Sequence, residues 1–130
     1  MDRGEWTREV AAVREPTRLH TLLEECGEHL DLELAATLKE RIDDINRDNP
    51  RLALALAEEA LAASGRCTNP LVRAWMLWAR AHAQMQLEEY QAGLSSCEAA
   101  LEILQSAGEE HTAAQVQVSR LFALVLSLIH

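Results

Sequence analysis

The stretch that decides the fold is residues 70–106, which read PLVRAWMLWARAHAQMQLEEYQAGLSSCEAALEILQS. Asn69-Pro70 opens it as a helix start, because Asn caps free backbone N–H groups and Pro lacks the N–H that the first helical position leaves unpaired. The Ala- and Leu-rich composition favours helix throughout. We predict one helix over 70–86 and a second over 89–106, which a glycine ends. We expect these two helices to lie antiparallel, as a hairpin.

The remaining chain carries the same kinds of start, stop and spacing. Asn49-Pro50 repeats the start signal, and Asp31 is placed to cap the helix before it. Pro16 interrupts the charged N-terminus, so residues 3–14 are predicted to form at most a short, loosely held helix. No segment alternates polar and apolar residues as a strand does. Further helices are predicted over residues 19–26, 31–48, 50–64 and 110–130, so the chain is predicted to be all-α.

Size and charge limit the classes of function. The chain has 130 residues, the size of one domain, and a formal net charge of −9 from 21 acidic and 12 basic residues. Such a balance argues against binding to nucleic acid or to an anionic membrane, which needs a basic surface. Residues 1–18 are charged throughout and do not predict a secretory signal, and the apolar run 121–129 has about half the length that spans a bilayer. We therefore expect a cytoplasmic protein with no nucleic-acid or membrane partner.

A repeat relates the helix pairs to one another. Both copies have the same order, which is an Ala-rich helix, a polar loop, and a helix with small residues at its centre. A period near 40 with two helices per unit is typical of helical solenoids, in which each hairpin covers the apolar face of its neighbour. A shift of 40 residues aligns six identical pairs: Glu58 with Glu98, Ala60 with Ala100, Leu61 with Leu101, Ala74 with Ala114, Arg80 with Arg120, and Ala83 with Ala123.

Side chains of the 70–106 hairpin also follow a family pattern. The first helix has large, small and ring-bearing residues, and the second has a ring followed by small residues: Trp75, Trp78, Ala79 and His82, then Tyr90, Gly93, Cys97 and Ala100. In this order they resemble the tetratricopeptide repeat (TPR) family. Residues 50–64 resemble the second helix of a preceding repeat, and residues 110–130 resemble the first helix of a following one. The pattern HLDLELAATL, at 29–38, is similar to the start of bacterial TPR proteins that carry a C-terminal caspase-like CHAT protease domain.

The resemblance implies a fold, a domain division and a function. The fold is a short right-handed TPR-like solenoid of stacked antiparallel helix hairpins. Residues 1–18 would be an N-terminal arm, a short helix or disordered, and residues 19–130 a repeat domain of about two to three repeats with the last incomplete. The implied function is a non-catalytic protein–protein interaction scaffold, an N-terminal segment of a larger bacterial protein. The alternative is a regulatory or sensor domain of an enzyme encoded downstream.

Candidate chemistry is sparse. Cys26 and His29, with His20 nearby, supply too few ligands for a zinc site, and the three cysteines form no C-x-x-C pair. Cys97 and His82 are the residue types of a nucleophile pair, but the family pattern assigns both to packing. The resemblance likewise puts Trp75 and Trp78 between the two helices of their repeat. We expect no enzyme activity, no metal and no cofactor.

Arginine is the most functional-looking signal. In TPR solenoids the first helix of each unit lines a concave groove, so the resemblance implies a set of groove residues: Arg73, Met76, Arg80, Gln84, Val116 and Arg120. Arg80 and Arg120 are equivalent under the shift and are predicted to lie side by side. Guanidinium groups bind carboxylates through paired hydrogen bonds. We therefore expect a groove for an acidic or extended peptide; the alternative is that these arginines pair with the chain's own acids.

The C-terminal segment LFALVLSLI, residues 121–129, is apolar on every face. Such a helix is either buried all round or has an exposed apolar patch, and exposed patches of this kind mark interfaces. A second copy of the chain is one expected cover and further repeats are another, so a homodimer is the alternative to a monomeric scaffold. The residues predicted to self-associate are Leu121, Phe122, Val125, Leu126, Leu128 and Ile129.

Overall fold

The computed structural model describes residues 1–130, and they form helices without any strand. This confirms the predicted all-α class. The elements in chain order are α1 (Arg3–Ala12), α2 (Pro16–Cys26), a short 3-10 turn (Gly27–His29), α3 (Leu32–Asp48), α4 (Pro50–Ser64), α5 (Pro70–Gln86), α6 (Tyr90–Ser106) and α7 (Glu110–Ile129).

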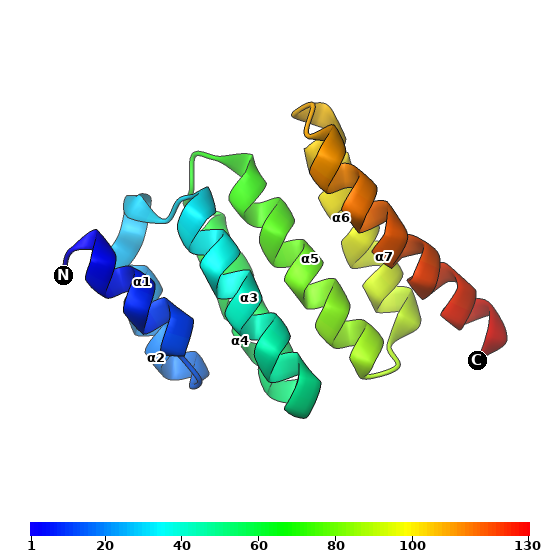
Figure 1. The fold of residues 1–130 in the computed structure, drawn as a ribbon, viewed down its shortest axis with the longest axis horizontal. Helices are drawn as coiled ribbons and strands as arrows, with labels where there is room; N and C mark the ends of the chain where they lie inside the picture. The colour runs from blue at the N-terminus through cyan, green and yellow to red at the C-terminus, as the bar shows by residue number, and fades with distance from the viewer.

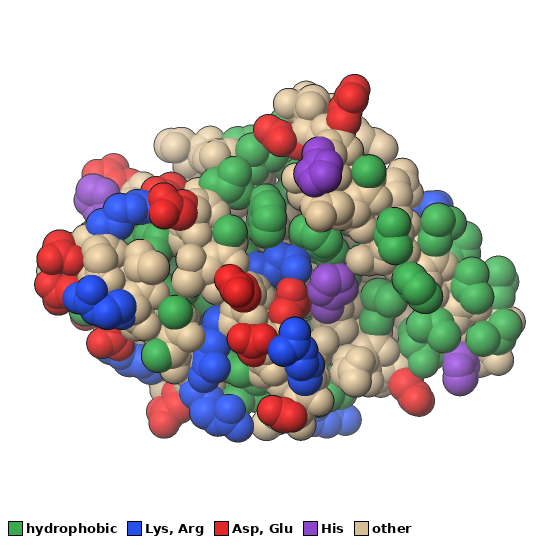
Figure 2. Space-filling view, viewed as in Figure 1, with side chains coloured by type: hydrophobic (Ala, Val, Ile, Leu, Met, Phe, Trp, Pro, Cys, Tyr) green, Lys and Arg blue, Asp and Glu red, His purple; other side chains and the backbone are tan.

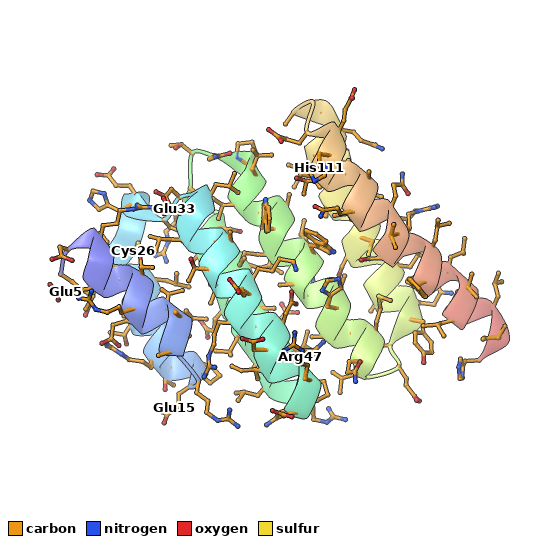
Figure 3. The ribbon with its side chains drawn as sticks, viewed as in Figure 1. Glu5, Glu15, Cys26, Glu33, Arg47 and His111 are labelled. Carbon is orange, nitrogen blue, oxygen red and sulfur yellow. The ribbon has the colours of Figure 1, made fainter.

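Local signals begin and end most of the helices within a residue or two of the predicted positions; α2 differs, because it starts at Pro16 and not at residue 19. Asp31 and Asn49 each accept the backbone N–H three residues on, at 3.0 and 3.1 Å, and Asn69 accepts the N–H two residues on at 3.0 Å. The turn after α6 contains Gly108 at a φ of 73°, a conformation that favours glycine. Helix α3 has an acid in its first turn and Arg47 in its last, which complements the helix dipole (Figure 3).

Consecutive helices run antiparallel, and they lie in two layers (Figure 1). In the front layer α1 packs on α3, α3 on α5, and α5 on α7; in the back layer α2 packs on α4, and α6 packs on both α5 and α7. The predicted antiparallel arrangement of the 70–106 hairpin is confirmed. One core of 32 buried residues runs through the chain from Val10 to Val116. The layers therefore share a single core.

The N-terminus contains a short helix, α1, which is one of the two forms predicted for residues 1–18, and this helix packs against the rest of the chain. Val10 and Val13 are buried in the common core, and α1 packs against α3. Arg3 forms an ion pair of 2.6 Å with Asp31 at the start of α3. Pro16 starts α2, so the boundary predicted after residue 18 lies within that helix. The burial of Val10 and Val13 was not predicted, because these two apolar side chains stand among many charged ones.

Candidate functional site

Two arginines of the predicted groove, Arg80 and Arg120, pair with acids of the same chain. Arg80 lies 3.6 Å from Glu58 on α4 and donates from Nε to Ser96 Oγ on α6 at 3.1 Å. Arg120 lies 4.0 Å from Glu98 on α6. Both arginines are equivalent under the shift of 40, and so are both glutamates. The alternative prediction, pairing with the chain's own acids, is what the structure contains.

Three other groove candidates are inside the core. Met76, Gln84 and Val116 are buried, so the prediction that they line an open surface is wrong. Gln84 accepts a hydrogen bond from the Ser96 hydroxyl at 2.7 Å, which satisfies its carbonyl within the core. The physical reason is the direction of one helix face. Positions four residues apart share a face, and on α5 that face turns toward α4 and α6. Of the six groove candidates, only Arg73 is exposed.

A cluster that the sequence did not predict joins the front helices α3, α5 and α7. We call it the three-helix polar cluster; its members are Lys39, Asp43, Trp78, His82 and Ser119. Lys39 Nζ lies 2.5 Å from Asp43 Oδ2, and His82 Nδ1 lies 3.2 Å from Asp43 Oδ1. His82 Nε2 lies 3.2 Å from Ser119 Oγ. A carboxylate only accepts, so His82 Nδ1 donates to Asp43; in the neutral imidazole, Nε2 then accepts from the Ser119 hydroxyl.

Trp78 completes this cluster. Its indole N–H donates to Ser119 Oγ at 3.2 Å, and Lys39 Nζ lies 4.0 Å from the centre of its ring, a cation–π contact. Trp78 is buried in the core, as the packing prediction expected, and these polar partners lie on α7 and α3. Trp75 lies against Trp78 with the two rings tilted and their centres 5.5 Å apart, and it lines an open pocket with residues of α3.

The charges of the cluster are mutually stabilised. Burial raises the pKa of the Asp43 carboxyl, but the hydrogen bond with His82 and the positive charge of Lys39 outweigh it. The pKa of Asp43 is therefore lowered, and the carboxylate stays ionised at neutral pH. Lys39, which is the only lysine in the chain, is itself buried. A buried lysine needs such a partner, since an unpaired buried charge is strongly unfavourable.

The cluster has the order of acid, base and hydroxyl that nucleophilic triads use, but its surroundings favour a structural role. The Ser119 oxygen already accepts the Trp78 indole N–H. Ser119 lies in the interior of α7, where backbone N–H groups are used by the helix and do not form an oxyanion hole. Lys39 neutralises the carboxylate that would stabilise a charged His82. The arrangement fastens α7 and α3 to α5.

The thiols lack the environment of reactive cysteines. Burial raises the pKa of Cys97 to about 11, and it also raises the pKa of Cys26 and Cys67. His29, weighed above as a metal ligand, stacks on Trp6 at 5.3 Å. No group of three or more His, Cys, Asp or Glu side chains is placed to hold a metal ion.

The largest uncovered apolar surface lies on α7. Only three of its residues are buried, namely Ala113, Val116 and Ala123. Large hydrophobic side chains that are 54–77% exposed follow one another along its outer side, and Figure 2 shows hydrophobic side chains gathered at the C-terminal end. We call this surface the α7 apolar face; it consists of Val118, Leu121, Phe122, Val125, Leu128 and Ile129. Five of the six residues predicted to self-associate belong to it, and Leu126 is half-buried.

By length and composition alone, α7 is also long and apolar enough to cross a membrane. The apolar segment is longer than the nine residues 121–129 considered in the sequence, because Val116 and Val118 extend it toward the start of the helix. No family model, curated protein or solved structure matches this chain.

Proposed function

We propose that this chain is a non-catalytic protein–protein interaction scaffold built from TPR-like helical hairpins. The two equivalent ion pairs support the repeat. Glu58 with Arg80 joins α4 to α5, and Glu98 with Arg120 joins α6 to α7. Each pair connects the second helix of one hairpin to the first helix of the next. The same contact at two successive interfaces requires the same helix-on-helix register, which is the property of a stacked repeat.

The observation that carries the proposal is the uncovered α7 apolar face. On α5, Ala81 and Met85 lie against Gly93 of α6, so closely that a Cβ added at Gly93 would come within 2.9 Å of the Met85 side chain. Under the 40-residue repeat, Ala81 and Met85 correspond to Leu121 and Val125, which are exposed on α7. The positions through which α5 packs against α6 are therefore exposed to solvent in α7.

Composition supports the same conclusion. Beyond the last turn of α5, Glu88 and Glu89 are exposed acids, as water favours. Their equivalents under the shift are Leu128 and Ile129, which are 77% and 68% exposed. Isolated exposed apolar residues are ordinary, but a contiguous row on one helix marks a contact surface. We infer that the face is kept apolar for a helical protein partner.

The test uses a probe that the chain itself provides. A labelled synthetic peptide of residues 89–107 carries the helix that α5 receives, and we expect it to bind the folded protein in a fluorescence-anisotropy titration. The double variant Leu121→Gln with Val125→Gln should bind it about tenfold more weakly or worse. The control Ala62→Gln, at an exposed alanine of α4, should bind as the wild type does. Equal affinity for all three proteins, or no binding to the wild type, would overturn the proposal.

A further inference from the structure

We infer that the α7 apolar face binds the same face of a second copy of this chain, so that the protein is a symmetric homodimer. The inference rests on the proposed function, because it identifies the helical partner of the α7 apolar face as α7 of a second copy. Three properties of the face select a second copy: the spacing of its side chains, its charge, and its area.

The spacing is that of a helix that pairs with its own kind. Val118, Leu121, Val125 and Leu128 follow one another by three, four and three residues, which is the a and d seam of a heptad. The two valines occupy a and the two leucines occupy d. Branched residues at a with leucine at d favour two-stranded association. A seam of this kind is self-complementary, since each knob meets a hole built from the same sequence.

The charge of the chain makes this face the natural meeting point of two copies. The net charge is −9, so two copies repel each other over most of their surfaces. Helix α7 has no acidic residue after Glu110, and its one arginine, Arg120, already pairs with Glu98 of its own chain. Two acidic chains can therefore approach along α7 without placing like charges opposite one another.

The area suffices for a specific contact. Six side chains that are 54–77% exposed present on the order of 600 Å² of apolar surface. Two copies would bury on the order of 1,200 Å² in total, the lower end of the range for stable interfaces. Met1 is the one large exposed hydrophobic residue outside this face, so no second apolar surface competes with it.

A bilayer fits this helix less well than a second copy does. A helix that crosses a membrane by itself is surrounded by lipid on all sides. The inner side of α7 is packed into the core through Ala113, Val116 and Ala123, and Arg120 is tied to Glu98. Helix α7 would have to leave the protein in order to span a membrane, whereas a second copy uses only the side that is already exposed.

Analytical ultracentrifugation of the full chain tests the inference. Over about a hundredfold range of concentration, the wild type should move from 14.5 kDa toward twice that mass. Leu121→Gln with Val125→Gln should weaken the dimer about tenfold or more, and Ala62→Gln should leave its dissociation constant unchanged. Circular dichroism checks that each variant is folded, and the dilution series of the wild type decides even if the double variant is not.

Each contrary outcome has a distinct meaning. A wild type that stays at 14.5 kDa throughout overturns the dimer. If that monomer still binds the peptide of residues 89–107, the proposed scaffold function stands and only the second copy is rejected. If it binds neither the peptide nor itself, both fail. Flotation of a monomeric wild type with phosphatidylcholine vesicles would replace the dimer with a lipid surface. A dimer that persists unchanged in the double variant would also reject the α7 apolar face.

Discussion

Replacing Ser119 with alanine should loosen the attachment of α7 to α5. The Ser119 oxygen accepts the Trp78 indole N–H, and its hydroxyl donates to His82 Nε2, each at 3.2 Å. Trp78 is 9% exposed, so its N–H would be left without a partner in the core. The His82 side chain is 28% exposed, so water can replace the bond that it loses. The expected penalty therefore comes mainly from the indole.

Two contributions set the size of the effect: the unpaired indole N–H of Trp78 and the higher helix propensity of alanine. An orphaned buried donor costs about 1–3 kcal/mol. Alanine has a higher helix propensity than serine, which raises the free energy of unfolding by about 0.5 kcal/mol. We expect the free energy of unfolding to fall by about 1–2 kcal/mol, which lowers the midpoint of urea denaturation by about 0.5–1 M. Circular dichroism at increasing urea measures this directly.

Ser127→Ala is the matched control, because Ser127 lies on the same helix and bonds only to the backbone carbonyl of Leu124. Its midpoint should stay near that of the wild type. In a Trp78→Phe background, which lacks the indole N–H, Ser119→Ala should cost at least about 0.5 kcal/mol less. Equal effects of Ser119→Ala and Ser127→Ala, or no coupling to Trp78, would refute the reasoning.

Three further results are expected. Because the folded-state pKa of Asp43 is lowered, mainly by its bond with His82 acting against burial, its stabilisation is complete above about pH 4 and is lost as pH falls through the folded value. Asp43→Asn should therefore remove part of the acid-induced loss of stability in urea titrations between about pH 6 and pH 3. In the folded protein at about pH 8, Ellman's reagent should modify half-buried Cys67 and leave Cys97, whose pKa burial raises to about 11, unmodified. Ala100→Leu should lower the free energy of unfolding by about 1–3 kcal/mol in urea, because Ala100 is fully buried among packed helices.

The helices could be predicted from the sequence because their signals are local. Asn49-Pro50 and Asn69-Pro70 each specify a cap and a first helical residue within two positions, and the structure has both. The packing of α1 could not be predicted in the same way, because the burial of Val10 and Val13 depends on contact with α3. A contact between distant segments cannot be predicted from the local sequence of either segment alone.

The candidate site was harder to predict for the same reason. The shared face of Arg80 and Met76 followed from their spacing, but the direction of that face depends on which helices surround α5. The spacing of four between Lys39 and Asp43 is consistent with an ion pair within one helix. Nothing in the sequence connects that pair to His82 or Ser119, because the connection depends on the register in which three helices lie side by side.

The shallow burial of α7 has a dynamic consequence. Only three of its twenty residues are buried, against nine of the seventeen in α5, so α7 should open locally more readily than α5. Its amide hydrogens should then exchange with solvent faster than those of α5, and occupation of its outer side should slow that exchange. The α7 apolar face therefore lies on a helix that is weakly buried for its length, and binding of a partner there would stabilise the C-terminal edge of the molecule.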